Sequence, residues 1–148
     1  MSHRVLFLCT GNYYRSRFAE ILFNDLARRH RIDASAFSRA LAIEKGSCNF
    51  GPISLHARAA CAERKLLIPE PVAFPCGATR EDFAAATRII ALKEAEHRRY
   101  VLAKFPDLAA RVEYWHVHDL DASPSDEACN MIEQHVIRLV DELKLRVR

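Results

Sequence analysis

Short apolar segments alternate along the chain with stretches whose apolar residues recur at helical spacing, and this alternation limits the possible folds most strongly. Residues 5–8, 36–41, 89–92 and 112–117 have the composition of strands buried within a sheet. Helical patterns separate them and follow the last one, where the apolar stripe comprises Ala128, Met131, Ile132, Val136, Leu139, Val140 and Leu143. The resulting β-α-β-α-β-α-β-α order predicts an α/β fold, a four-stranded parallel sheet with helices on both faces.

Capping residues and prolines mark the expected helix boundaries. Ser54 is a suitable N-cap for the second helix, and Thr79 with Asp82 resembles a capping box that opens a short helical turn. Pro106 closes one helix, and another proline lies in the first turn of the last. The expected helices cover residues 16–30, 54–63 and 94–105 and begin again near residue 123, with the short turn at 79–82.

The composition is that of an ordinary globular chain of 148 residues, of which 50% are hydrophobic and 28% charged. We expect a single domain over residues 1–148, large enough for a sizeable core. The net charge of +3 is mild and the basic residues are spread along the chain, which argues against a nucleic-acid partner. No apolar run approaches the ~20 residues of a membrane span, and the run before Cys9 is too short for a signal peptide, so we expect a cytoplasmic protein with no membrane partner.

The five cysteines do not follow a disulfide or metal pattern. Their number is odd and no two lie in a CxxC arrangement, so neither a disulfide framework nor a structural zinc site is expected. His116, His118 and Asp119 superficially resemble a metal cluster, but Asp121 stands where a metallohydrolase pattern would need histidine. We therefore expect no metal and no other cofactor.

Cys9 ends the first predicted strand, and Arg15 and Ser16 stand six and seven positions further on, where the first predicted helix begins. The other four cysteines have Ser54, Leu67, Asp82 and His135 six positions on, so Cys9 alone fits a C-x5-R pattern. Ligands bind at the carboxyl ends of the strands in open parallel sheets, which places the loop from Cys9 to Arg15 at the expected site. The plain alternative is a buried structural cysteine near a surface arginine.

The residue types of this loop suit the cleavage of phosphate esters. Backbone N–H groups of a loop entering a helix point inward, and the helix dipole favours an anion there. We expect Gly11 to take the unusual dihedral angles of a tight loop, and the planar guanidinium of Arg15 to match two phosphate oxygens. The positive field should favour a thiolate on Cys9, which can attack phosphorus and form a phosphocysteine. Ser16 could donate a hydrogen bond to that sulfur.

Residues 5–12, together with Arg15 and Ser16, resemble the signature of the low-molecular-weight protein tyrosine phosphatases. The resemblance extends over nearly all of the chain and includes Ser38, the turn at 49–52, the stretch at 79–83 and the strand at 89–92. It implies a four-stranded parallel sheet, with the phosphate-binding loop between the first strand and the first helix, and metal-free hydrolysis of phosphomonoesters.

The resemblance also assigns roles to individual residues. Cys9 and Arg15 would be catalytic, and the phosphate-binding residues would be Thr10, Gly11, Asn12, Tyr13, Tyr14, Arg15 and Ser16. Asn12, Ser16 and Ser38 would form a hydrogen-bond network that supports the loop. A late aspartate would act as general acid. The loop after the fourth strand lacks the family's Asp-Pro-aromatic motif, and we expect Asp119 to be the acid, with Asp121 as the alternative.

Two neighbouring tyrosines depart from the family pattern. Tyr14 stands where many members carry a second cysteine, so a protective disulfide within the loop is not available. Tyr13 could stack on an aryl substrate or simply pack against its neighbours, and the pair could reshape the mouth of the site.

Three functions remain open at this point. The first is phosphatase catalysis by a monomer or weak dimer, with a phosphotyrosine-bearing protein or a small aryl phosphate as the substrate. Arsenate reduction is disfavoured because Cys76 and Cys129 have no nearby partner cysteine in the sequence that could form an electron relay. A non-catalytic phosphate-binding module is disfavoured because Cys9, Arg15 and Ser16 are all present.

Overall fold

Four parallel strands form the centre of the computed structural model, which describes residues 2–46, 48–117 and 125–146. The strands are β1 (His3–Cys9), β2 (Ala34–Ala40), β3 (Arg88–Ala91) and β4 (Val112–Tyr114), arranged in the order β2-β1-β3-β4. The helices are α1 (Arg15–Arg29), α2 (Leu55–Glu63), α3 (Arg80–Ala85), α4 (Glu94–Lys104) and α5 (Ser125–Arg146), with 3-10 turns η1 (Ile43–Gly46) and η2 (Pro106–Arg111). The predicted α/β fold with a four-stranded parallel sheet is confirmed.

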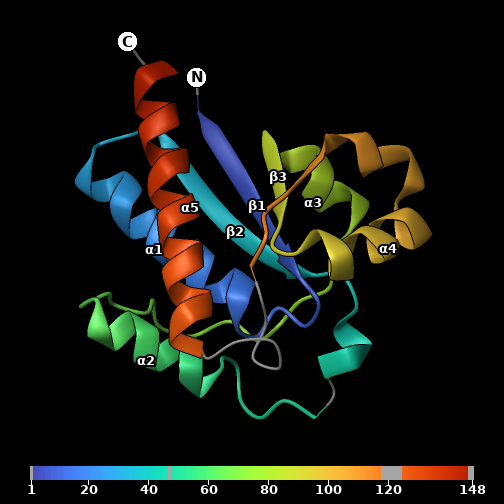
Figure 1. Ribbon diagram of the computed structural model, residues 1–148, viewed down its shortest axis with the longest axis horizontal. Coiled ribbons are helices and arrows are strands. Elements are labelled where there is room, and N and C mark those ends of the chain that lie inside the picture. Colours follow the sequence, from blue (N-terminus) through green and yellow to red (C-terminus); the bar gives the residue numbers. More distant parts are fainter. Residues whose placement is uncertain (1, 47, 118–124, 147–148) are drawn as a thin grey trace.

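The sheet separates two hydrophobic cores, which explains why β1 is apolar at successive positions. Val5 and Phe7 face the core built with α1, α2 and α5, whereas Leu6 and Leu8 face the core built with α3 and α4. Figure 1 shows α1 and α5 on one side of the strands and α3 and α4 on the other. All four of these β1 side chains are fully buried, as expected for a strand covered on both faces.

The helix starts follow the capping signals closely. Ser54 caps α2 by accepting from the N–H groups of His56 and Ala57, and Thr79 and Asp82 form a reciprocal capping box at the start of α3. The apolar stripe of α5 is buried as predicted, with Met131 half-buried at its margin. The expected helix start at residue 123 lies outside the described residues. The described part of α5 begins at Ser125.

The predicted fourth strand is longer than the strand observed. It was expected to reach Val117, but β4 ends at Tyr114. Parallel pairing stops here because β3 itself ends at Ala91, where the chain turns towards α4. Beyond this point His116 pairs with Lys93 in an isolated antiparallel bridge.

The direction in which the chain moves across the sheet reverses at β1. After β1 the chain continues to β2 on one side, and it later crosses to β3 on the other side. Ligands bind at such switch points in open α/β sheets, at the carboxyl ends of the strands. The loop that follows Cys9 begins at this point.

Candidate functional site

A cavity of about 540 Å³ opens at the carboxyl end of β1. Three segments line it: the loop that begins at the end of β1, the end of η1 with Asn49 after it, and α4. The lining residues are Cys9, Thr10, Gly11, Tyr13, Tyr14 and Arg15, then Lys45, Gly46 and Asn49, then Glu96, Arg99 and Tyr100. Six of the residues singled out from the sequence therefore share one cavity wall.

The thiol of Cys9 is buried at this cavity next to the first turn of α1. Its Sγ lies 3.0 Å from Ser16 Oγ, within hydrogen-bond distance. Ser16 Oγ in turn accepts a 3.0 Å hydrogen bond from Asn12 Nδ2. Because the amide already supplies a donor to this hydroxyl oxygen, the Ser16 hydrogen can be directed at the sulfur.

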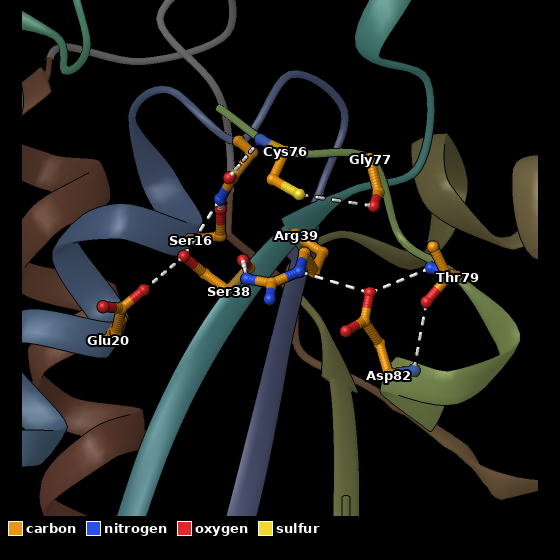
Figure 2. A network of polar contacts seen from close by, with 9 residues as sticks. Ser16, Glu20, Ser38, Arg39, Cys76, Gly77, Thr79 and Asp82 are labelled. Atoms are coloured by element: carbon orange, nitrogen blue, oxygen red, sulfur yellow. Dashed lines mark hydrogen bonds and ion pairs between the residues drawn. The ribbon is translucent and has the colours of Figure 1, made fainter. Parts of the chain in front are cut away.

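Asn12 organises the loop from behind. Its Nδ2 also donates to Ser38 Oγ at 2.9 Å, its Oδ1 accepts from the backbone N–H of Cys76 at 3.0 Å, and its side chain is only 2% exposed. The Ser38 hydroxyl in turn donates a hydrogen bond to Glu20 Oε1. We call Asn12, Ser16, Ser38 and Glu20 the Asn12 cluster. Figure 2 shows Ser38 on β2 bonded towards Glu20 of α1.

The neighbouring strand residue, Arg39, extends polar contacts towards α3. Its Nε donates to Asp82 Oδ2 at 3.2 Å, and Asp82 also belongs to the capping box with Thr79. Successive residues of β2 therefore bond towards different helices, Ser38 to α1 and Arg39 to α3 (Figure 2). This connects the loop support to both faces of the sheet.

The tight turn of the loop is made by Asn12 and not by Gly11, which corrects the expectation for the glycine. Asn12 has φ of +52°, in the left-handed region, whereas no positive φ is found at Gly11. Asparagine tolerates this conformation better than most residues, and here its side-chain hydrogen bonds hold it there. A Cβ at Gly11 would lie 3.4 Å from Asn49 Nδ2, which is an ordinary van der Waals contact, so close packing does not require a glycine here.

Arg15 is held by a second group of polar residues on the α4 side. Its Nη2 donates to Glu96 Oε2 at 2.7 Å, and Thr10 Oγ1 donates to the same oxygen at 2.5 Å. His97 Nε2 lies 2.8 Å from Glu96 Oε2 and 3.1 Å from Thr10 Oγ1. We call Thr10, Arg15, Glu96 and His97 the Glu96 cluster.

The carboxyl groups of the two clusters have pKa values shifted in opposite directions. Burial raises the pKa of Glu20, although hydrogen bonding by Ser38 and the charge of Arg17 oppose this effect. The hydrogen bond from His97, together with the charge of Arg15, holds the pKa of Glu96 well below its usual range despite partial burial. Glu96 is therefore a carboxylate at neutral pH and a poor proton donor.

The two tyrosines have different surroundings. Tyr13 is half-buried, its hydroxyl donates to the carbonyl of Phe50, and its own carbonyl accepts from Ser54 N–H at 3.0 Å. Tyr14 is 8% exposed, and its hydroxyl lies 3.3 Å from Cys129 Sγ of α5. Tyr14 thus anchors the loop to the core, and Tyr13 is the more accessible aromatic wall of the cavity.

The other four cysteines are not among the residues that line the cavity, although Cys76 and Cys129 contact residues of the loop. Cys48 and Cys76 are exposed, and Cys61 and Cys129 are buried. Burial and, to a lesser degree, the neighbouring Cys129 raise the pKa of Cys61 to about 11, so this thiol is unreactive at neutral pH. Within the described ranges, no group of three or more His, Cys, Asp or Glu side chains is arranged to hold a metal ion.

The sequence identified most of the site residues in the loop but not those on α4. Asp119 and Asp121 lie outside the described residues. Glu96 and His97 were not singled out, although they follow the third predicted strand and so belong near the same sheet edge. Arg17 was also missed: it is 6% exposed and donates to the carbonyl of Pro52, and burial lowers its pKa against the opposing charges of Glu20 and Cys9.

Comparison with known proteins adds a family and a set of similar folds. The family model for low molecular weight phosphotyrosine protein phosphatases matches residues 4–148. No curated protein matches the chain. In the part of the chain that the structure describes, no helix has the length and apolar composition to cross a membrane.

Solved structures align along almost the full length of the chain. YfkJ from Bacillus subtilis is 19% identical, with a TM-score of 0.84 and coverage of 100% of this chain and 98% of its own. The low molecular weight protein tyrosine phosphatase of T. tengcongensis is 25% identical, with a TM-score of 0.75 and coverage of 98% and 99%. The YwlE arginine phosphatase of Geobacillus stearothermophilus is 20% identical, with a TM-score of 0.75 and coverage of 97% and 94%.

Proposed function

The chain belongs to the low molecular weight phosphotyrosine protein phosphatase family, and from this premise we propose that it hydrolyses phosphotyrosine in proteins, or small aryl phosphates, through a phosphocysteine on Cys9. The observation that carries the proposal is the 3.0 Å contact between Cys9 Sγ and Ser16 Oγ at the cavity, with Arg15 on the same wall. These groups supply a nucleophile, a donor to its sulfur and a phosphate-binding cation at the start of α1.

In the first step the phosphoryl group is bound by the backbone N–H groups of the loop and by the guanidinium of Arg15. The Cys9 thiolate attacks phosphorus, so the S–P bond forms while the bond from phosphorus to the leaving oxygen breaks. The leaving phenolate takes a proton from a general acid. We assign this acid to Asp119, with Asp121 as the alternative.

In the second step a water molecule attacks phosphorus and the S–P bond breaks. The acid that gave up its proton accepts one from the water, and inorganic phosphate leaves. Ser16 stabilises the departing thiolate, because Asn12 Nδ2 already donates to Ser16 Oγ and leaves its hydrogen for the sulfur. Neither step requires a metal ion or another cofactor.

The composition of the cavity walls favours an aromatic substrate. Tyr13 from the loop and Tyr100 from α4 both line it and are both half-buried, so their rings could contact an aryl group. Because one similar structure is an arginine phosphatase, substrate class is best tested by direct competition between a phosphotyrosine peptide and a phosphoarginine peptide. Faster hydrolysis of the phosphoarginine peptide would overturn the tyrosine assignment and leave the phosphatase assignment intact.

The experiment that tests the proposal compares the wild type with Cys9→Ser on an aryl phosphate. We expect Cys9→Ser to lose turnover and to keep binding inorganic phosphate, because the loop amides and Arg15 remain. Turnover within tenfold of the wild type would refute the nucleophile assignment. A wild type that binds phosphate without any turnover would instead indicate a non-catalytic binding module.

A further inference from the structure

Three contacts converge on one oxygen of Glu96, and they come from three different parts of the site. Arg15 Nη2 lies 2.7 Å from Oε2, Thr10 Oγ1 lies 2.5 Å from it, and His97 Nε2 lies 2.8 Å from it. Arg15 and Thr10 belong to the loop, whereas Glu96 and His97 belong to α4. The carboxylate therefore joins the phosphate-binding loop to a helix that is distant in sequence.

The protonation state of His97 is set by its surroundings. Its side chain is fully buried, and its Nδ1 accepts a 3.1 Å hydrogen bond from the backbone N–H of Lys93. In the neutral ring the proton must then lie on Nε2, the atom that faces Thr10 and Glu96. Burial lowers the pKa of His97, which favours this neutral form.

The hydrogen bonds consequently run in one direction. The single Nε2–H of neutral His97 is shared between Glu96 Oε2, at 2.8 Å, and Thr10 Oγ1, at 3.1 Å. The Thr10 hydroxyl donates to Glu96 Oε2, and Arg15 donates to the same carboxylate oxygen. Every donor points towards Glu96, and the pKa of this carboxyl is held well below its usual range, first by His97 and then by Arg15. Such a carboxylate is fixed in position and permanently charged at neutral pH.

From this geometry we propose that Glu96 is a positioning residue for Arg15, and that Thr10 and His97 fix Glu96 in turn. An arginine side chain has many rotamers, and a guanidinium that must meet the transferring phosphoryl group acts best when its orientation is set beforehand. Glu96 holds Nη2 while Arg15 lines the cavity. The inference rests on the proposed function, because it assigns Arg15 to the phosphoryl group.

The test measures inorganic phosphate affinity by calorimetry and aryl phosphate turnover in parallel. We expect Glu96→Ala to weaken phosphate binding and to lower kcat by about 10- to 100-fold, the range for losing a hydrogen bond to a charged group. Glu96→Gln keeps an acceptor without the charge and should fall between Glu96→Ala and the wild type. The matched control is Glu94→Ala on the same helix, whose carboxylate pairs with exposed Arg98 and whose removal should change both quantities less than twofold.

A double-mutant cycle separates positioning from general damage to the fold. If Glu96 acts through Arg15, adding Glu96→Ala to Arg15→Lys should lower affinity and kcat by less than about threefold further. Equal losses in both backgrounds, or a Glu96→Ala variant with wild-type phosphate affinity and kcat, would overturn the inference and leave the proposed function standing. If the wild type hydrolyses no phosphoester, the proposed function fails, and the phosphate affinities alone decide the inference.

Discussion

The loop after β1 is held from two sides by clusters of opposite character. The Asn12 cluster lies on the side of β2 and α1 and consists of an amide, two hydroxyls and a carboxyl whose pKa is raised by burial. The Glu96 cluster lies on the side of α4 and is built around an ion pair whose carboxyl has a lowered pKa. The first cluster bonds to Cys9, the proposed nucleophile, through Ser16, and the second bonds to Arg15, the proposed phosphate-binding cation.

The difference suggests a division of labour between loop shape and charge placement. Asn12 fixes the backbone, since it combines a left-handed φ with three hydrogen bonds at a buried position. Glu96 bonds instead to the side chains of two loop residues, Thr10 and Arg15. We therefore expect damage to the Asn12 cluster to appear mainly in stability, and damage to the Glu96 cluster to appear mainly in catalysis.

The largest expected effect concerns the general acid that protonates the leaving group, which we place outside both clusters. Glu96 is held as an anion, so the account requires the acid to lie elsewhere. We predict that Asp119→Asn slows phosphotyrosine hydrolysis by ~10²–10⁴ and slows an activated nitrophenyl ester much less, since its leaving group hardly needs a proton. Asp121→Asn should have a smaller effect on both substrates, and the reverse order would move the assignment to Asp121.

Arg15→Lys should have the next largest effect, because it keeps the charge and loses the planar fork. We expect kcat/KM for an aryl phosphate to fall by ~10²–10³, the range for losing a preorganised donor to the transition state. Steady-state kinetics measures this loss, and urea denaturation should show nearly unchanged stability. Activity within threefold of the wild type would show that the guanidinium geometry is irrelevant.

The contrast between the clusters is sharpest for Asn12→Ala against Glu96→Ala in urea denaturation. Asn12→Ala leaves buried partners unpaired and places alanine in the left-handed region, so we expect a loss of about 3 kcal/mol in the free energy of unfolding. Glu96→Ala should lose about 1 kcal/mol, because its side chain is 20% exposed and solvent can replace part of the contact. Equal losses would contradict the proposed division of labour.

The smallest effects concern the pH dependence of stability, and they differ in sign between the clusters. Burial lowers the pKa of His97. Its contribution to the free energy of unfolding is therefore present above the unfolded pKa of 6.5 and is lost as the pH falls from there through the folded pKa. The pKa of Glu20 is raised by burial, so its contribution is present below its unfolded value of 4.5 and is lost as the pH rises through the folded value.

Denaturation at several pH values checks these two signs. His97→Gln should flatten the decline in stability on acidification below pH 6.5, whereas Glu20→Gln should improve stability at neutral pH relative to acid pH. A His97→Gln variant with the wild-type slope would show that folding does not lower the pKa of His97.

The fold was largely predictable because its signals are local or periodic. The apolar run at Val5–Leu8 and the caps at Ser54 and Thr79 each act over a few residues, and the stripe of α5 has a plain helical period. The end of β4 was not predictable, because it depends on where the neighbouring β3 stops. The left-handed turn at Asn12 was assigned to Gly11 for the same reason: its stabilising partners, Ser38 and Cys76, come from distant segments.

The loop of the site was also visible in the sequence, through the spacing of Cys9, Arg15 and Ser16. Glu96 and His97 were not, because α4 is polar around most of its circumference, with His97 and Val101 as its buried residues. No periodicity distinguishes the polar residue that faces the cavity from those that face solvent. Only the docking of α4 beside β1 and β3 determines that Glu96 meets Arg15.

The most direct test of the central claim is to trap the covalent intermediate. The wild-type enzyme is mixed with an aryl phosphate, denatured within one turnover, and digested for mass spectrometry of the peptide that contains Cys9. We predict a phosphoryl group on the Cys9 sulfur that forms and decays at rates consistent with kcat. Rapid turnover with the phosphoryl group on another residue, or with no covalent species at any time, would contradict it.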